Sequence, residues 1–167
     1  MKSKNKELNS ILQKIKIVLT DVDGVLTDCG MYYTETGLWM KKFNVRDGMG
    51  SSLLRKAGYK VGIITTDKTD IAKVRGEWLN LDYIFYGIND KKKILEQICL
   101  QERVDFENVS FIGDDVNDLT ILESVGFSAA PKDAMAEIKN IVDYVCSKKG
   151  GEGAFREYAN LILSAKN

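Results

Sequence analysis

Histidine is missing from this 167-residue sequence, and its absence excludes a broad range of chemistry. Without histidine, the chain alone cannot carry a Ser-His-Asp triad, a Cys-His protease site, a phosphohistidine or a histidine-ligated metal. A G-x4-G-K-[S/T] phosphate loop is also absent, which excludes the usual nucleotide site of that type. Acid–base chemistry must therefore use Asp, Glu, Lys or Tyr.

Cysteine, long apolar runs and net charge are also scarce or missing. The three cysteines lie far apart without a C-x-x-C pair, which disfavours a zinc site and disulfides. No apolar run approaches the ~20 residues that span a bilayer, and the polar N-terminus lacks the apolar segment of a signal peptide. Lys plus Arg and Asp plus Glu both number 24, which gives no support for nucleic-acid or membrane-surface binding. We expect a cytoplasmic protein with one domain over residues 1–167.

Short β-branched segments alternate with longer amphipathic segments along the chain. The expected strands are 16–20, 61–65, 83–85, 109–112, 126–129 and 144–145, and the expected helices are 48–57, 69–80, 91–102, 117–125, 133–140 and 154–164. This alternation predicts an α/β fold, a Rossmann-like doubly wound, mainly parallel sheet with helices on both faces. Residues 30–44 break the pattern and predict a small β-hairpin around Thr36-Gly37, which must pack on something to be stable. We expect no cap domain in a chain of 167 residues.

Polar side chains follow several of the expected strands. Asp21 and Asp23 come after the first strand, Thr65 and Thr66 end the second, and the run 113–118 follows the fourth. The loop after the third strand leads to Lys91. Because the carboxyl ends of parallel strands share one edge of the sheet, we expect these groups to meet there.

The acidic residues at this edge favour a cation. Asp21, Asp23, Asp114, Asp115 and Asp118 would repel one another if they were not neutralised. Oxygen ligands without histidine or cysteine favour Mg2+, and a lysine and a hydroxyl beside it suit a phosphoryl group. Of two aspartates in one turn, one can attack phosphorus to form an aspartyl-phosphate. The other can protonate the leaving alkoxide and then activate water.

These residues resemble the four motifs of the haloacid dehalogenase superfamily. Residues 21–27 (DVDGVLT) match the first motif, Thr65 the second, Lys91 the third and residues 113–118 (GDDVND) the fourth. Two further segments, 43–50 and 149–157, resemble signatures of the capless 3-deoxy-D-manno-octulosonate 8-phosphate phosphatases. Together, these matches cover essentially the whole chain.

The resemblance implies a Mg2+-dependent phosphatase that acts on a phosphorylated sugar acid in lipopolysaccharide biosynthesis. Asp21 would be the nucleophile and Asp23 the general acid/base, while Thr65 and Lys91 would bind phosphate. The metal ligands would be Asp21, the backbone carbonyl of Asp23, and Asp114, while Asp115 and Asp118 would orient the metal's waters or Lys91. The family also implies a homotetramer, in which the hairpin and the Gly-rich C-terminal segment (149–167) close a neighbour's site.

The chain length of the sugar acid stays open. The octulosonate phosphatases usually carry Gly-Arg after the second-motif threonine, whereas this chain has Thr66-Asp67, followed by Lys68. An acid at this position resembles the phosphatases of nine-carbon, sialic-acid-type substrates, but residues 44–48 are of the octulosonate type. Thr66, Asp67, Lys68, Arg46 and Gly151 are therefore candidate substrate contacts. Arg46 could instead pair with surface acids, and Gly151 could belong only to a loop that starts a helix.

Two classes other than enzymes use similar residues. A receiver-type phospho-acceptor also carries an acidic pair, a threonine and a lysine on a similar sheet, but it has no need of a proton donor such as Asp23. An oligomerisation or regulatory module with this fold is the other alternative. Repeated turnover of phosphate would distinguish an enzyme from both.

Overall fold

The computed structural model describes residues 2–166, with side chains from residue 7 onward. Six strands form a parallel sheet in the order β5-β4-β1-β6-β7-β8. These strands are β1 (Ile17–Thr20), β4 (Lys60–Ile64), β5 (Tyr83–Phe85), β6 (Val109–Ile112), β7 (Phe127–Ala130) and β8 (Tyr144–Val145). The predicted α/β fold class is confirmed, as is the prediction of an additional hairpin.

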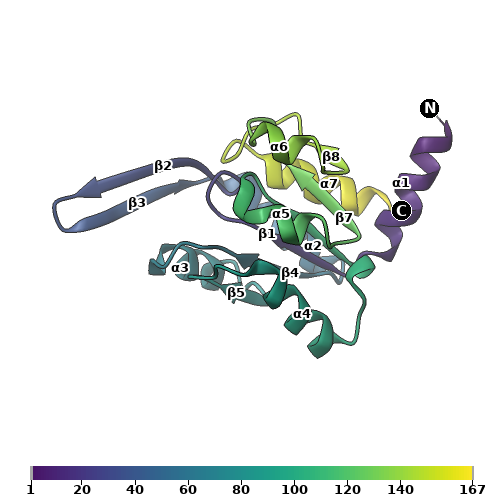
Figure 1. Ribbon diagram of the computed structural model, residues 1–167, viewed down its shortest axis with the longest axis horizontal. Coiled ribbons are helices and arrows are strands. Elements are labelled where there is room, and N and C mark those ends of the chain that lie inside the picture. Colours follow the sequence, from purple (N-terminus) through teal and green to yellow (C-terminus); the bar gives the residue numbers. More distant parts are fainter. Residues whose placement is uncertain (1, 167) are drawn as a thin grey trace.

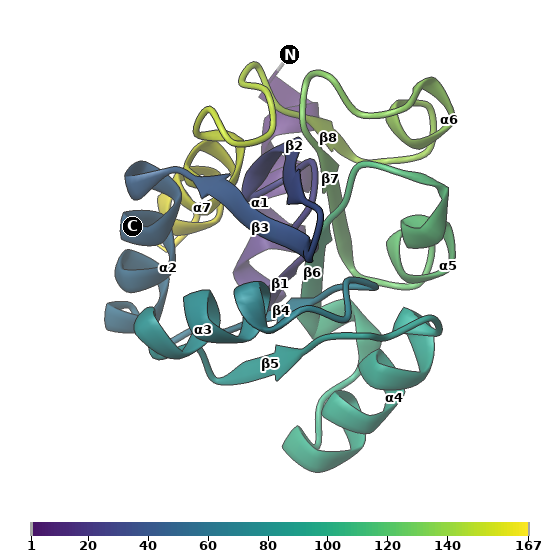
Figure 2. The ribbon, with the colours of Figure 1, turned by 90° about the vertical axis from the view of Figure 1, so that its left-hand side faces the viewer.

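Helices cover both faces of this sheet (Figures 1 and 2). One face packs against α1 (Lys2–Lys14), α2 (Val45–Lys56), α3 (Asp70–Trp78) and α7 (Ala154–Ser164). The other packs against α4 (Lys91–Glu102), α5 (Leu119–Leu122) and α6 (Ala136–Lys139). Strand β1 is buried on both sides, since Val18 belongs to the first cluster while Ile17 and Leu19 belong to the second. This double burial explains why the strand reads as a continuous apolar run.

Several boundaries differ from the expected ones for local reasons. Helix α1 was not expected, and its Leu12 is buried in the first cluster. Helix α2 starts earlier than residue 48 because the side chain of Asn44 caps it by accepting a hydrogen bond from the Arg46 amide. Helix α5 is short and follows a 3-10 turn (Val116–Asp118), since Asp115 binds the backbone at its start.

The hairpin consists of β2 (Thr27–Thr34) and β3 (Gly37–Phe43) and projects away from the sheet (Figure 1). Its ladder begins at Thr27, earlier than expected, because Thr27 pairs with Phe43. The expectation that the hairpin packs against something applies only to its base, where Lys41 is buried. Farther out, Tyr33 and Trp39 are each 67% exposed.

The topology brings the functional strand ends together. Strand β1 lies between β4 and β6, and all three run in the same direction. The Asp21 amide donates a hydrogen bond to the Ile112 carbonyl, so the turn after β1 is tied to the end of β6. From β1 the chain continues first to β4 and β5 on one side and then to β6, β7 and β8 on the other. In open α/β sheets, ligands bind in the crevice at the carboxyl ends of the strands where the strand order reverses in this way. Among the described residues, no helix is long and apolar enough to cross a bilayer.

Candidate active site

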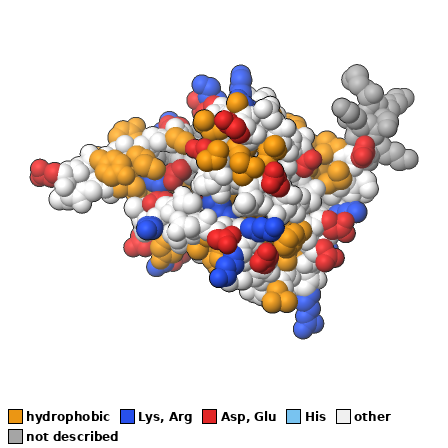
Figure 3. Space-filling model, viewed as in Figure 1, with side chains coloured by type: hydrophobic (Ala, Val, Ile, Leu, Met, Phe, Trp, Pro, Cys, Tyr) orange, Lys and Arg blue, Asp and Glu red, His pale blue; other side chains and the backbone are white. Residues whose placement is uncertain are grey.

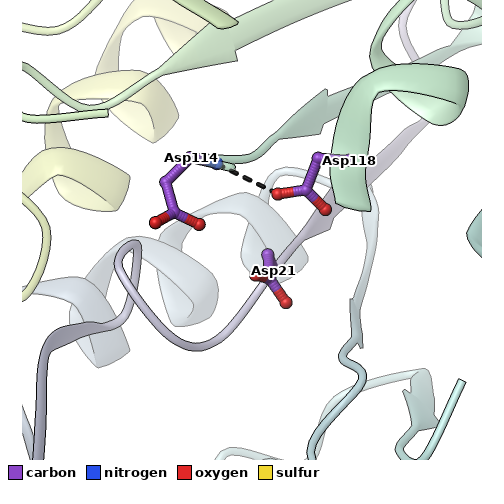
Figure 4. Close-up of side chains that lie close together, drawn as sticks. All are labelled: Asp21, Asp114 and Asp118. Carbon is purple, nitrogen blue, oxygen red and sulfur yellow. Dashed lines mark hydrogen bonds between the residues drawn. The ribbon is translucent and has the colours of Figure 1, made fainter. Parts of the chain in front are cut away.

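Three carboxylates converge at the carboxyl edge of the sheet (Figure 4). Asp21 follows β1, while Asp114 and Asp118 come from the loop after β6. Each offers an oxygen, and these oxygens all lie within 4.8 Å of one another. The predicted meeting of the first and fourth motifs is thus present in the structure.

Lys91 completes this cluster from the start of α4. Its buried ammonium lies 2.9 Å from Oδ1 of Asp21 and 2.5 Å from Oδ1 of Asp118. The other oxygen of Asp118 accepts a hydrogen bond from the Asp114 amide at 3.0 Å. Both oxygens of Asp118 are therefore engaged, which favours the predicted orienting role over direct metal ligation. Lys92 and Lys93, the next residues of the helix, are exposed.

Burial and like charge perturb the site carboxyls. Burial, followed by the charge of Asp118, raises the pKa of Asp21 to about 7, although Lys91 opposes the shift. Burial, followed by the charges of Asp21 and Asp118, raises the pKa of Asp114 to about 8. One lysine does not neutralise three ionised carboxylates, so full ionisation of the cluster would leave an excess of negative charge.

The donor set fits Mg2+. The three carboxylates bring oxygens within 4.8 Å of one another, and Oδ1 of Asp21 is buried at 2.9 Å from the ammonium of Lys91. The carboxylate of Asp114 lies against Gly24, where an added Cβ would come within 1.9 Å of Oδ2. This contact brings Asp114 to the turn that carries the Asp23 carbonyl, as the predicted ligand set requires. Hard oxygens with excess negative charge suit Mg2+.

Asp23 faces a different partner. Its Oδ2 lies 2.6 Å from the ammonium of Lys41 in β3, and its Oδ1 accepts a long hydrogen bond of 3.3 Å from the Thr27 hydroxyl. Lys41 also lies 2.7 Å from Oδ2 of Asp67. Burial lowers the pKa of Lys41, but the hydrogen bonds to Asp23 and Asp67 outweigh burial, and its pKa is raised.

The residues after β4 lie in contrasting environments. Thr65 is buried, and its hydroxyl accepts a hydrogen bond from the Asp67 amide at 3.2 Å. Asp67 binds Lys41 and also accepts hydrogen bonds from the amide and hydroxyl of Thr69. Burial raises the pKa of Asp67, but these hydrogen bonds outweigh burial and lower it. Thr66 is partly buried and Lys68 is exposed, and both stay predicted substrate contacts.

Three other predicted residues lie outside the carboxylate cluster. Asp115 is exposed, and its side chain accepts a hydrogen bond from the Val116 amide. Arg46 is exposed and lines a hollow of about 340 Å³ beside α7, whose lining includes none of the clustered carboxylates. Gly151 packs against its own chain, with its amide donating to the Val25 carbonyl and its carbonyl accepting from Asn44. Their predicted roles stay predictions.

Two further residues, Lys41 and Asp47, were not among the predicted site residues. Lys41 stands beside the exposed Lys42, and a pair of lysines in a strand is typical of a solvated surface. Asp47 is buried in α2, and its Oδ1 accepts a hydrogen bond from the Arg156 amide at the start of α7. The two signature-like segments, 43–50 and 149–157, could have suggested this contact, since two unusual segments of one chain are candidates for mutual packing.

Comparisons with known proteins agree with this geometry. The family model described as haloacid dehalogenase-like hydrolase matches residues 60–156. The 3-deoxy-D-manno-octulosonate 8-phosphate phosphatase KdsC of Haemophilus influenzae is 39% identical over 155 residues, covering 93% of this chain and 86% of the relative. The crystal structure of the Moraxella catarrhalis phosphatase of that name, in complex with magnesium, phosphate and KDO, superposes with a TM-score of 0.92. It is 31% identical and covers 96% of this chain and 92% of its own.

A second similar structure also holds a metal. The cobalt-bound deoxy-D-mannose-octulosonate 8-phosphate phosphatase of H. influenzae has a TM-score of 0.90 and 39% identity, covering 93% of this chain and 91% of its own. The matching family model spans more than half of this chain, and the relatives match nearly all of it. The chain therefore belongs to the family of haloacid dehalogenase-like hydrolases.

Proposed function

We propose that this chain is a Mg2+-dependent phosphatase that hydrolyses a phosphorylated sugar acid, with 3-deoxy-D-manno-octulosonate 8-phosphate as the first candidate substrate. One observation carries the proposal. The two aspartates of one turn face different partners, Asp21 the Lys91 cluster and Asp23 the ammonium of Lys41. Two carboxyls in distinct environments can take the roles of nucleophile and proton donor.

The reaction has two steps, the formation of an aspartyl-phosphate and its hydrolysis. A carboxylate oxygen of Asp21 bonds to phosphorus while the bond from phosphorus to the sugar oxygen breaks, and Asp23 gives its proton to that oxygen. Water then bonds to phosphorus and passes a proton to Asp23, and the bond between Asp21 and phosphorus breaks. Lys91 and Thr65 hold the phosphoryl oxygens during both steps.

A divalent cation would be held by Asp21, Asp114 and the carbonyl of Asp23. When bound, Mg2+ supplies positive charge that neutralises the carboxylates and the phosphoryl oxygens. The close approach of three carboxylate oxygens in the described cluster, within 4.8 Å of one another, supports this assignment.

We also infer that the chain forms a homotetramer through the hairpin. Apolar side chains gather on the projecting hairpin (Figure 3). Between β3 and α3 lies an apolar groove of about 590 Å³, lined among others by Trp39, Met40, Phe43, Ile71, Val74 and Trp78. Trp78 is 79% exposed, and burial of such a surface favours association. Closure of a neighbour's site by residues 149–167, like a cytoplasmic location, stays a prediction.

The test is phosphate release from eight- and nine-carbon sugar-acid phosphates, with hexose phosphates as controls. We expect many turnovers on 3-deoxy-D-manno-octulosonate 8-phosphate, loss of activity in EDTA and recovery with Mg2+. Preference for the nine-carbon substrate would replace the first candidate. Release of a single equivalent without recycling would contradict the phosphatase and favour a phospho-acceptor.

A further inference from the structure

Among the described residues of the hairpin, Lys41 is the one whose buried ammonium contacts the carboxylates of Asp23 and Asp67. Its side chain is 0% exposed, while its two carboxylate partners, Asp23 and Asp67, are 21% and 12% exposed. The adjacent Lys42 is 61% exposed and pairs with Asp28 on the surface. Two neighbouring lysines of one strand thus have opposite environments, as the alternation of a strand requires.

A buried ammonium is costly unless carboxylates surround it. Here the two carboxylates approach from different elements, Asp23 from the turn after β1 and Asp67 from the loop after β4. Asp67 is itself fixed by the amide and hydroxyl of Thr69. Asp67 therefore holds the ammonium of Lys41 in a defined position, and the contact with that ammonium fixes the orientation of the Asp23 carboxylate.

The contact leaves one oxygen of Asp23 free for chemistry. Lys41 occupies Oδ2 at 2.6 Å, whereas Oδ1 has only the 3.3 Å contact from Thr27 among the described residues. A carboxyl that must give a proton to a leaving oxygen needs a fixed orientation, because proton transfer requires hydrogen-bond distance.

We propose that Lys41 is a positioning residue, which fixes Asp23 in the orientation that delivers its proton to the leaving oxygen, and that Asp67 anchors Lys41. This inference rests on the proposed phosphatase function. It adds that Lys41, a residue of the hairpin, supports the proton donor Asp23. Lys41 need not touch the substrate in this role.

The test compares two leaving groups in single-turnover experiments with the Lys41→Met protein. The leaving group of 3-deoxy-D-manno-octulosonate 8-phosphate is a sugar alkoxide, a strong base that needs a proton to leave. The leaving group of p-nitrophenyl phosphate is p-nitrophenolate, a weak base that leaves without one. We expect the release rate of the sugar to fall by about 100-fold and that of p-nitrophenol by less than about 10-fold, since only the first depends on the proton donor. Lys42→Met is the matched control and should change both rates by less than about 2-fold, as is usual for an exposed pair.

Asp67→Asn provides a second variant that keeps the shape of the anchor. We expect it to show the same dependence on the leaving group with a smaller loss. Equal losses on both substrates in a variant with a wild-type circular dichroism spectrum would overturn the proposal, and so would unchanged rates in Lys41→Met.

A crystal structure of Lys41→Met gives a readout that does not need activity. We expect the carboxylate of Asp23 to rotate away from its wild-type position. A carboxylate that stays in place overturns the positioning role, whatever the wild-type activity. If the wild-type protein released no phosphate from either substrate, the proposed phosphatase function would be wrong. The orientation of Asp23 in the crystal structure of Lys41→Met would still test whether Lys41 positions Asp23.

Discussion

Asp21 and Asp23 are separated by a single residue, yet their carboxylates have different neighbours. Asp21 is buried beside Lys91 and Asp118, and Asp23 lies partly exposed beside Lys41. The chain turns tightly at Gly24, directly after Asp23. The positive φ of Gly24, 82°, and its contact with Asp114 leave no room for a side chain there. At the scale of residues, the site depends on this turn to direct two identical groups to two roles.

The role of Asp21 can be tested by Asp21→Asn. Asparagine has nearly the same shape but is not a nucleophile, so we expect kcat to fall by at least ~1000-fold while the fold is retained. Steady-state phosphate release and circular dichroism measure the two effects. Glu96→Gln makes the same kind of change, from carboxylate to carboxamide, at an exposed residue of α4 and should keep full activity. Retained activity in Asp21→Asn would refute the nucleophile assignment.

The pKa values of Asp21 and Asp114 predict how stability depends on pH without metal. Both are raised in the folded protein, to about 7 and about 8 from 3.8. A carboxyl with a raised pKa binds its proton more tightly when folded, so stability is lost as pH rises through this range. We expect the free energy of unfolding in EDTA to fall by on the order of a few kcal/mol between about pH 5 and about pH 8.

Denaturant titrations with EDTA and with Mg2+ measure this effect. Carboxyls with lowered pKa values, such as Asp67 and Glu157, are already ionised above about pH 5 and contribute little in this range. Mg2+ binds the ionised carboxylates, so it should stabilise the protein more at high pH than at low pH. A metal-free protein whose stability rises toward pH 8 would contradict the prediction.

At the scale of elements, the loop before α2 and the start of α7 form one unit. The side-chain amide of Asn44 donates a hydrogen bond to the Gly151 carbonyl, and Oδ1 of Asp47 accepts one from the backbone amide of Arg156 at 2.8 Å. Gly150 lies so close to the turn after β1 that an added Cβ would come within 1.8 Å of the Gly24 carbonyl oxygen. The C-terminal segment thus supports the turn that carries Asp21 and Asp23.

Asp47 acts as a cap from another helix, and its substitution tests this link. Asp47→Ala removes the acceptor for an amide in the first turn of α7, so we expect a loss of about 1–2 kcal/mol in the free energy of unfolding. Asp47→Asn keeps an acceptor oxygen and should lose less. Urea denaturation measures both variants. Equal losses would show that the hydrogen bond to Arg156 is not what stabilises α7.

At the scale of the whole molecule, the hairpin connects the site to the surface. Its base holds Lys41 among Asp23 and Asp67, and its outer part exposes apolar side chains beside α3. Any neighbour that packs on the hairpin would therefore affect the same strand that positions the proton donor.

Sedimentation equilibrium tests the association through this groove. We expect the wild-type protein to have the mass of a tetramer and Trp39→Ser/Trp78→Ser to have a lower mass, because the change removes apolar surface from the contact. Leu100→Ser is the control, since Leu100 is 83% exposed on α4 outside the lining of the groove. A monomeric wild-type protein would rule out the proposed tetramer.

Strand and helix order followed from the sequence because periodicity and turn chemistry are local. The final helix was expected at 154–164 and lies at Ala154–Ser164. Lengths were less predictable for α5 and α6, since their starts depend on contacts with the site loop. The amide of Met135, for example, donates to the Asp114 carbonyl just before α6 begins.

Residue order alone shows that an apolar strand ends in two acids and that lysine, threonine and further acids follow other strands. Parallel topology then made their convergence predictable. Which acid has which partner became known from the folded chain, because the charge pairs join residues that are distant along the sequence. Lys41 lies 18 positions from Asp23 and 26 from Asp67, and no local pattern distinguishes it from the exposed Lys42. Packing of the hairpin's base against the carboxyl edge of the sheet is what buries one lysine and leaves the other in water.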